Sequence, residues 1–254
     1  MPVGLGGAQA YNLTMISRFH FPGRLPAAGE LELPDALAHH AVRVLRLRDG
    51  ERIVLFDGEG GEAEATLQVR GKAAWAQVEA RHEVDRESPL QIVLVQALAA
   101  GDKMDWVVQK AVELGASAIQ PVQAERSVLR LAGERADKRQ AHWQQVAVAA
   151  CEQCGRNRIP EVRPLQALAH WLAAHRDALC YVLAPGGAAS FAEEPAPQQA
   201  VHVLVGPEGG WSDAELAAFD AAGCRRVRLG PRVLRTETAG LAAIAALQAR
   251  WGDF

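Results

Sequence analysis

Two loops rich in glycine and proline, close to the C-terminal end of the sequence, constrain the fold of this chain more than any other feature. One follows the apolar run Val201–Val205, the other follows the run at residues 226–229, and both lead into segments with helical spacing. A strand, a loop and a helix in this order are typical of parallel α/β sheets, which bind ligands at the carboxyl ends of their strands. We therefore predict an α/β fold in which residues 205–211 and 229–240 form two walls of one site.

The first loop has a backbone suited to close contact with a ligand. Gly206, Gly209 and Gly210 permit positive φ angles and close approach, while Pro207 stiffens the turn and Ser212 begins a capping-box pattern for the next helix. The loop lacks the lysine and hydroxyl of a Walker loop and the glycine spacing of a dinucleotide fingerprint. Taken alone, it is as typical of a simple turn as of a binding loop.

The second loop changes this balance because it concentrates polar and ionic groups. Within seven positions it carries Arg232, Arg235, Thr236, Glu237 and Thr238. An apolar helical pattern follows at once, from Leu241 to Gln248. Ordinary surface turns rarely have this density of charge, so the two loops together favour a binding or catalytic site.

The two loops, with residues 151–161 upstream, closely resemble the bacterial 16S ribosomal RNA uridine-N3 methyltransferases of the RsmE type, which belong to the SPOUT superfamily. The resemblance extends from about Arg18 to Phe254 and includes the join at residues 85–90 and the helix that starts after Gly101. It implies a SPOUT methyltransferase domain with a trefoil knot at residues 85–254, preceded by a PUA-like β-barrel domain at residues 17–84 that helps to bind RNA. Sequence patterns alone would not predict a knot, since knots are rare.

Composition sets the general class of protein. The chain has 254 residues, of which 49% are hydrophobic and 22% are charged, which is ordinary for a globular protein with one large or two modest domains. No apolar stretch approaches the roughly 18 residues of a membrane span, and the first residues lack the pattern of a signal peptide. We expect a cytoplasmic protein without membrane contact, with residues 1–16 as a loose extension.

Residues 17–84 read as a small β-rich module. Short apolar or alternating runs at residues 52–57, 62–70 and 73–80 predict a meander of three strands. Before them, Asp35 is expected to cap a short helix that turns four apolar residues inward and Arg43 and Arg46 outward. The four apolar residues are Leu37, Ala41, Val44 and Leu45.

Strand and helix patterns alternate after residue 90. Apolar runs at residues 91–98, 118–122 and 179–184 predict strands, and residues 102–114 and 141–154 predict helices, with Asp102 and Gly115 at the ends of the first. Cys151 and Cys154 have a spacing that can serve a metal or a disulfide. They share a helix face with apolar residues, however, and Cys180 and Cys224 look isolated, so we expect packing cysteines and no metal.

The net charge of −3 excludes a protein that coats nucleic acid through a general positive field. Local clusters remain suited to phosphate, and we predict RNA contacts by Arg43, Arg46, Arg156 and Arg158. Any single arginine is also explained as solvated charge. For Arg156 and Arg158, a complement to the C-terminus of the preceding helix is nearly as good an explanation.

The resemblance also implies a cofactor, a reaction and an assembly. The cofactor would be S-adenosylmethionine, held by Leu183, Val205, Gly206, Pro207, Gly210, Leu229, Gly230, Leu234 and Thr236. The reaction would be methyl transfer to N3 of a decoding-centre uridine in 16S rRNA of the assembled small ribosomal subunit. SPOUT proteins generally act as homodimers, and the alanine-rich helix at residues 239–251 would then face a second copy.

Four side chains are candidates for the chemistry. Arg235 or Arg232 could stabilise negative charge on the uracil oxygens, and Glu237 or Glu208 could accept the N3 proton. Structural alternatives remain, since Glu237 could serve only as an ion-pair partner and Thr236 only as a helix cap. Two other functions also remain open: ribose methylation of transfer RNA by a related SPOUT enzyme, and RNA binding without catalysis.

Overall fold

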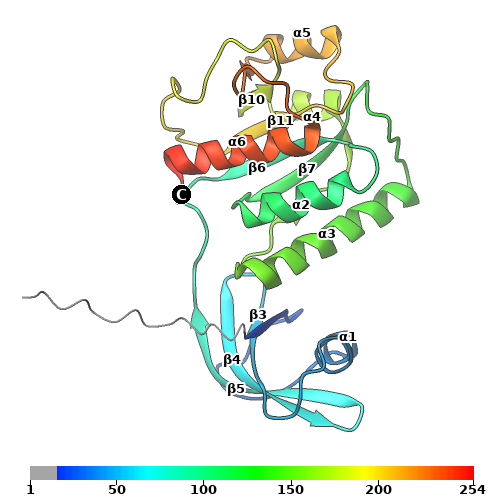
Figure 1. Cartoon of the computed structure of the whole chain (residues 1–254), viewed down its shortest axis with the longest axis vertical. Helices are drawn as coiled ribbons and strands as arrows, with labels where there is room; N and C mark the ends of the chain where they lie inside the picture. The colour runs from blue at the N-terminus through cyan, green and yellow to red at the C-terminus, as the bar shows by residue number, and fades with distance from the viewer. Residues whose placement is uncertain (1–15) are drawn as a thin grey trace, which may run out of the picture. The chain divides into compact units, whose positions relative to one another are not determined.

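The computed structural model describes residues 16–254, so the extension predicted for residues 1–16 lies outside the described residues except for its last position. The chain divides into two compact units, the first ending at Val84 and the second beginning at Asp85 (Figure 1). Each unit has its own sheet and its own hydrophobic core. The predicted contact residues for RNA are divided between the units, whereas the two C-terminal loops belong wholly to the second.

Unit 1 contains a five-stranded sheet with the order β1-β3-β4-β5-β2. Its strands are β1 (Ser17–His20), β2 (Gly29–Glu32), β3 (Arg52–Phe56), β4 (Gly61–Arg70) and β5 (Ala73–Glu83). The meander of β3, β4 and β5 is antiparallel and confirms the strands predicted from alternation. Alternate residues of β4 and β5 are buried, as expected for a sheet with one covered face.

The short helix of unit 1 departs from the predicted pattern. It consists of α1 (Asp35–His39), which continues directly into the π-helix η1 (His40–Val44). Leu37 and Ala41 are buried as predicted, but Val44 and Leu45 are exposed, so this part of the prediction is wrong. A π-helical turn contains more residues than an α-helical turn, and it therefore rotates the later side chains away from the core.

Unit 2 is built on a parallel sheet with the order β12-β10-β11-β6-β7-β8, with β9 paired to β7. Its strands are β6 (Ile92–Ala97), β7 (Ala118–Gln123), β8 (Glu161–Val162), β9 (Gln166–Ala167), β10 (Leu179–Leu183), β11 (Val201–Val205) and β12 (Arg225–Val227). Every residue of the central strands β6 and β11 is buried, because helices cover both faces of the sheet. The parallel α/β sheet predicted from the sequence is confirmed.

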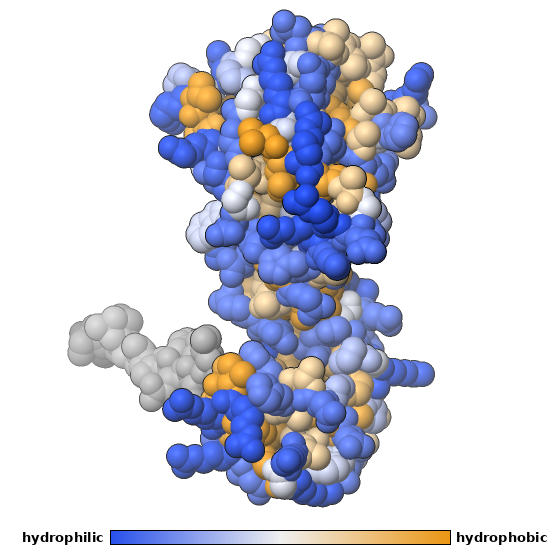
Figure 2. Space-filling view, turned by 90° about the vertical axis from the view of Figure 1, so that its right-hand side faces the viewer, coloured by the Kyte–Doolittle hydropathy of each residue, from blue (hydrophilic) through white to orange (hydrophobic). Residues whose placement is uncertain are grey.

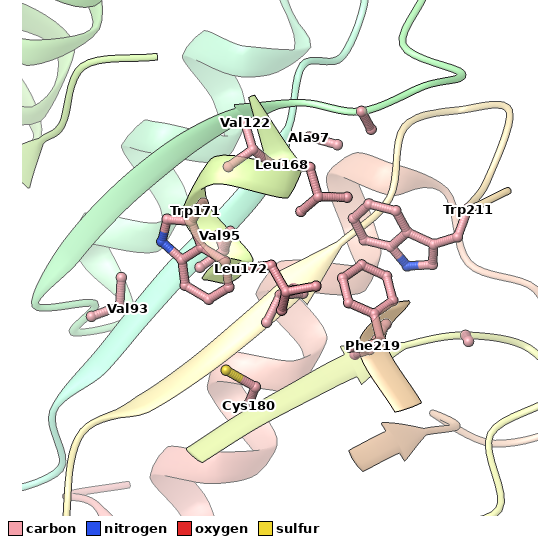
Figure 3. Packing of buried hydrophobic residues seen from close by; sticks show 14 of the residues in the cluster. Val93, Val95, Ala97, Val122, Leu168, Trp171, Leu172, Cys180, Trp211 and Phe219 are labelled. Atoms are coloured by element: carbon pink, nitrogen blue, oxygen red, sulfur yellow. The ribbon is translucent and has the colours of Figure 1, made fainter. Parts of the chain in front are cut away.

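Five helices surround this sheet. They are α2 (Lys103–Glu113), α3 (Glu134–Cys154), α4 (Leu168–Ala174), α5 (Asp213–Ala221) and α6 (Thr236–Trp251). In the core of Figure 3, α4 supplies Trp171 and Leu172, which lie over β6 near Val95, while Phe219 of α5 packs against Trp211. Among residues 16–254, no helix is long and apolar enough to cross a membrane.

The helix predicted at residues 141–154 begins seven residues earlier, at Glu134. The added residues are charged and mostly exposed, so hydrophobic periodicity could not detect them. Gly133, with φ 51°, precedes the helix, and Gly155, with φ 87°, ends it in the left-handed conformation that glycine favours.

The helix caps follow the sequence only in part. Asp35 lies inside the first turn of α1 behind the N-cap Pro34 and caps nothing, so that prediction is wrong. Asp102 is the N-cap of α2 but makes no side-chain cap hydrogen bond. The capping box of α5 is confirmed: the Glu215 amide donates to Ser212 Oγ at 3.2 Å, and the Ser212 amide donates to Glu215 Oε2 at 2.9 Å.

Gln248, on α6, connects three segments of unit 2 through its side chain. Its side chain is fully buried, accepts a hydrogen bond from Ser88 Oγ at 2.6 Å and donates to the Leu114 carbonyl at 3.1 Å. A Cβ at Gly115 would lie 2.6 Å from Gln248 Nε2, so only glycine fits there. This contact, the Gln248 seam, joins the first residues of unit 2 to the end of α2 and to the last helix.

The four cysteines form two pairs. Cys151 and Cys154 lie one turn apart on α3. Cys180 of β10 contacts Cys224, which directly precedes β12, because the parallel pairing of Tyr181 with Arg225 brings the preceding residues together. The prediction that Cys180 and Cys224 are isolated is therefore wrong. The contact with Cys224 and burial raise the pKa of the Cys180 thiol. Within residues 16–254, no three histidine, cysteine, aspartate or glutamate side chains are placed to hold a metal ion.

Candidate active site

The two C-terminal loops meet at the carboxyl edge of the sheet in unit 2. In Figure 1, β6 and β7 run toward the side of the unit on which α2, α3 and α6 begin, and the turn after β11 lies at the same edge. Figure 2 faces this side and shows apolar groups surrounded by hydrophilic ones. We call residues 206–211 the first loop and residues 228–235 the second loop.

A cavity of about 360 Å³ lies between the two loops. Ten predicted site residues line it: Leu183, Val205, Gly206, Pro207, Glu208, Gly210, Leu234, Arg235, Thr236 and Glu237. Its walls are mainly apolar side chains and loop backbone, with charged groups contributed by α2, both loops and the start of α6. This composition is typical of small-molecule sites, where a few polar groups fix the orientation of the ligand.

Three predicted residues lie outside this cavity. Leu229 and Arg232 line a smaller adjoining space of about 80 Å³, which shares Leu183 and Leu234 with the larger one. Gly230 borders a separate groove beside α6. The structure therefore brings most of the predicted site together and places Arg232 and Gly230 at its outer side.

Hydrogen bonds fasten the first loop to the rest of the site. Trp211 Nε1 donates to the Leu183 carbonyl at 3.1 Å, and its ring packs so closely on Gly206 that a Cβ there would lie 3.2 Å from it. Thr236 Oγ1 donates to the Gly206 carbonyl at 2.6 Å and accepts from Gln96 Nε2 at 2.9 Å. Thr236 therefore links the two loops, and it does not act as the cap of α6, whose N-cap residue is Arg235.

The connection between β7 and α3 supports the same loop from outside. Arg126 Nη1 donates to the Trp211 carbonyl at 3.0 Å and to the Gly209 carbonyl at 3.4 Å. A Cβ at Gly209 would lie 3.1 Å from Arg126 Cβ, so this contact leaves little room for a side chain. The backbone of the first loop is thus set before any ligand binds.

Opposite charges gather at one end of the cavity. Lys103 Nζ donates to Glu208 Oε1 at 2.8 Å, and the Ala100 amide donates to the same oxygen at 3.0 Å. Burial opposes ionisation of Glu208, but the hydrogen bonds from Lys103 and from backbone amides outweigh it, and the pKa of this carboxyl is lowered. Glu208 is therefore an ionised carboxylate that is already engaged by Lys103.

Glu237 has a different environment from Glu208. Its Oε2 atom is buried, accepts no hydrogen bond from the described residues and lies 3.8 Å from Lys103 Nζ. Arg235 is exposed at the cavity wall and pairs with no carboxylate in the described part of the chain. Among the described residues, the site thus offers one carboxylate that pairs with Lys103 without accepting a hydrogen bond at Oε2, and one guanidinium without a carboxylate partner.

The predicted RNA contacts have different outcomes. Arg43 and Arg46 are exposed in unit 1, and Arg158 is exposed in unit 2. Arg156 is only 5% exposed: it pairs with Glu87 and donates to the carbonyls of Val112 and Ala116 at 2.8 and 2.9 Å. Its guanidinium is fully engaged by partners inside unit 2. The prediction that Arg156 projects toward RNA is therefore wrong.

Sequence reasoning did not identify Lys103, Gln96 or Arg126 as part of the site. Gln96 is on β6, Lys103 begins the helix after β6, and Arg126 lies in the loop after β7; β6 pairs with β11, and β7 is the next strand of the sheet. Lys103 stands near the start of the helix after β6, a position that favours ligand contact in parallel sheets. Recognising it required the strand order, because Glu208 is 105 positions away in the sequence.

Comparisons with known proteins agree with the two-unit structure. A family model described as an RNA methyltransferase domain matches residues 86–248, and a model described as an RNA methyltransferase PUA domain matches residues 33–79. Ribosomal RNA small subunit methyltransferase E of Bacillus subtilis is 34% identical over 220 residues, covering 82% of this chain and 86% of that protein. The protein of the same name from Mycobacterium tuberculosis is 34% identical over 252 residues, covering 93% and 94%.

Two solved structures with bound S-adenosylmethionine are also similar. The ribosomal RNA small subunit methyltransferase E of Neisseria gonorrhoeae superposes with a TM-score of 0.89 at 44% identity, covering 94% of this chain and 99% of that one. A putative methyltransferase of Legionella pneumophila gives a TM-score of 0.90 at 37% identity, covering 95% and 100%. These matches confirm an α/β SPOUT methyltransferase domain preceded by a PUA-like domain, while the knot itself stays a prediction.

Proposed function

Because this chain belongs to the family of ribosomal RNA small subunit methyltransferases E, we propose that it methylates N3 of a decoding-centre uridine in 16S rRNA of the assembled small subunit. The observation that supports this most is the cavity between the two loops, where an apolar, glycine-lined wall meets Lys103, Arg235 and Glu237. The proposal places the enzyme in the cytoplasm, with S-adenosylmethionine as cofactor.

The cavity fits S-adenosylmethionine in size and in chemistry. Its volume of about 360 Å³ lies within the range of small-molecule sites, which is roughly 300–1,000 Å³. Gly210, with φ 68°, has open space where a side chain would stand, so its backbone can approach a ligand. Apolar side chains such as Leu183, Val205 and Leu234 suit a neutral purine. When bound, the cofactor supplies an electrophilic sulfonium methyl group.

The chain's own residues must align the uridine and manage its proton. Methylation joins the methyl carbon to N3, breaks the carbon–sulfur bond and releases the N3 proton, so the uracil develops negative charge as that proton leaves. Arg235 is placed to stabilise this charge, as donors of an oxyanion site do. Holding donor and acceptor in line supplies the rest of the acceleration by removing much of the entropic barrier.

Glu237 is the better candidate for the proton acceptor. A base needs a lone pair that no donor occupies; Glu237 lines the cavity, and its Oε2 atom accepts no hydrogen bond from the described residues, although Lys103 Nζ lies 3.8 Å away. Glu208 is bound by Lys103 and by the Ala100 amide, and its pKa is lowered, so it is the weaker base. Lys103 is then the residue that holds Glu208 in place and contributes positive charge beside Glu237.

We further propose that the enzyme is a homodimer formed through α6. The outer side of this helix, from Leu241 to Ala249, is lined by leucine and alanine side chains that are only partly covered. The neighbouring helix α2 adds Trp106, which is 52% exposed. Partly exposed apolar side chains on two neighbouring helices are typical of a protein interface. Light scattering of the purified protein tests this proposal, and a mass of one chain at micromolar concentration would contradict it.

Methyl transfer from labelled S-adenosylmethionine to unmethylated small ribosomal subunits, followed by mass spectrometry of the digested RNA, tests the proposed function. 3-Methyluridine is the expected product. Cofactor binding with a different methylated nucleoside, such as a ribose-methylated one, would change the target and keep the enzyme class. Binding of RNA without binding of S-adenosylmethionine would support the non-catalytic alternative.

A further inference from the structure

A basic segment contacts the outer side of the first loop, after β7. It comprises residues 125–139, which follow β7 and form the start of α3. Arg126 bonds to the backbone of the first loop, and the Glu125 amide donates to Glu215 Oε1 at 2.8 Å. The beginning of the segment is therefore fixed against the first loop, and the whole segment lies on the edge of unit 2 toward which the strands point (Figure 1).

Local hydrogen bonds hold the loop part of this segment in a definite shape. Gln123 Nε2 donates to the Leu129 carbonyl at 3.0 Å, and the Ala124 amide donates to Ser127 Oγ at 3.3 Å, with Ser127 almost fully buried. Between these anchors Val128 is 74% exposed. An apolar side chain displayed on a fixed backbone can contact a partner without a large loss of conformational entropy.

The charge of the segment is opposite to that of the whole chain. It carries five basic residues and three acidic ones, a balance of +2, whereas the chain as a whole has a net charge of −3. The basic residues are Arg126, Arg130, Arg135, Lys138 and Arg139, and the acidic ones are Glu125, Glu134 and Asp137.

Two of these arginines are free to meet a partner. Arg135 and Arg139 stand four positions apart on α3, so they share one face of the helix, and both are exposed. Among residues 16–254, neither forms an ion pair, whereas Lys138 lies 3.7 Å from Glu134. Exposed guanidiniums without acidic partners are well suited to phosphate, which they bind with two parallel hydrogen bonds.

We propose that residues 125–139 form a docking surface for single-stranded RNA next to the target nucleotide, a proposal that rests on the proposed function. A nucleoside that enters the cavity carries phosphates on both sides, and these must cross the rim of the site. Arg130, Arg135 and Arg139 bind those phosphates, and Val128 covers an adjacent sugar or base. Arg126 bonds to the backbone of the first loop and so holds this surface in a fixed position relative to the cavity.

Charge reversal tests this surface. Arg135→Glu and Arg139→Glu are compared with Arg176→Glu, an exposed arginine after α4 that belongs to neither the cavity nor the segment. The first two should raise the KM for small subunits several-fold and weaken binding of a single-stranded RNA of about 12 nucleotides. Each lost phosphate contact should reduce the slope of log affinity against log salt by about 0.7. The values of kcat, cofactor affinity and Tm should match the wild type, and the Lys variants at both positions should retain binding.

Three outcomes decide between the alternatives. A KM and RNA affinity equal to those of Arg176→Glu would overturn the docking surface. An increase in KM for subunits with unchanged affinity for the RNA oligonucleotide would also overturn it and assign the segment to a ribosomal protein. Absence of methyl transfer by the wild type would sink the proposed function instead, and the oligonucleotide measurement would still decide the surface.

Discussion

The two loops that form the cavity are held in very different ways. Each position of the first loop is bonded or packed against a neighbour, including Arg126, Leu183, Thr236 and Lys103. In the second loop, residues 229–234 make no hydrogen bond among the described residues, and Val233 is 80% exposed. The first loop is thus a preformed wall, while the second keeps its polar groups uncommitted. We therefore expect the first loop to fix the cofactor together with Leu234, and the polar residues of the second loop to meet the substrate.

The largest expected effect is on the rate of methyl transfer, when Arg235 at the end of the second loop is replaced. Arg235→Ala should lower kcat by about 100-fold to 1,000-fold, the usual loss for one donor that stabilises developing charge. The fold should be retained, because the side chain is exposed and has no partner to lose. Single-turnover methyl transfer measures this, with Arg232→Ala as the control that alters only the adjoining small space. Full turnover by Arg235→Ala would remove Arg235 from the site.

The strand below the first loop carries a pH-sensitive group. Burial, together with repulsion from His175 and Arg163, lowers the pKa of His202 on β11 from 6.5 to about 4. Between pH 6.5 and 4, His202 is therefore protonated in the unfolded chain but neutral in the folded chain. The free energy of unfolding is highest above pH 6.5 and falls as the pH drops toward 4. The loss should reach about 3 kcal/mol. Urea unfolding at several pH values checks this, and His202→Gln should flatten the profile.

The two glutamates of the cavity give a direct test of the contrast. Glu237→Gln should slow methyl transfer by about 100-fold, because it removes the proposed proton acceptor. Glu208→Gln should affect the chemical step much less and mainly weaken the contact with Lys103. Single-turnover rates across a range of pH distinguish the two. Equal rates for both variants would show that the proton leaves by another route.

A smaller effect, on cofactor affinity, is expected when either of two glycines with a left-handed backbone is replaced. Gly210→Val in the first loop should weaken S-adenosylmethionine binding by at least about tenfold, since it adds strain at φ 68° and a side chain that faces the cavity. Gly230→Val in the second loop has similar strain, at φ 75°, but lies outside the main cavity. Calorimetric titration should show the greater loss for Gly210→Val, and the reverse order would contradict the assigned walls.

Much of the fold could be predicted because strands and helices leave local signals. The apolar runs of β6 and β11, the alternation of β4 and β5 and the Ser212 capping box were all readable. The start of α3 could not be predicted, because its first residues are mostly charged and show no hydrophobic periodicity. In η1, a change of helix type altered which residues face the core.

The site was predictable where its residues are neighbours in sequence and unpredictable where they are not. The charged residues of the second loop were found from their own composition, and the cofactor residues of both loops followed from the family resemblance, whereas Trp211 and Val233, which also line the cavity, were missed. The bond from Lys103 to Glu208, and the burial of Arg156 against Glu87, join residues 105 and 69 positions apart. Such contacts depend on the strand order of a sheet, and a single sequence carries no local signal for that order.

The Gln248 seam has a consequence for the order of folding events. Its hydrogen bond with Ser88 joins residues 160 positions apart, and closing a chain of that length costs on the order of 4 to 5 kcal/mol in entropy. Contacts with such a cost form after the local helices and hairpins, so the seam is absent from the early folding nucleus. Interactions that form late slow unfolding more than they speed folding. We therefore expect the hydrogen bonds of Gln248 to slow the unfolding of unit 2 more than they speed its folding.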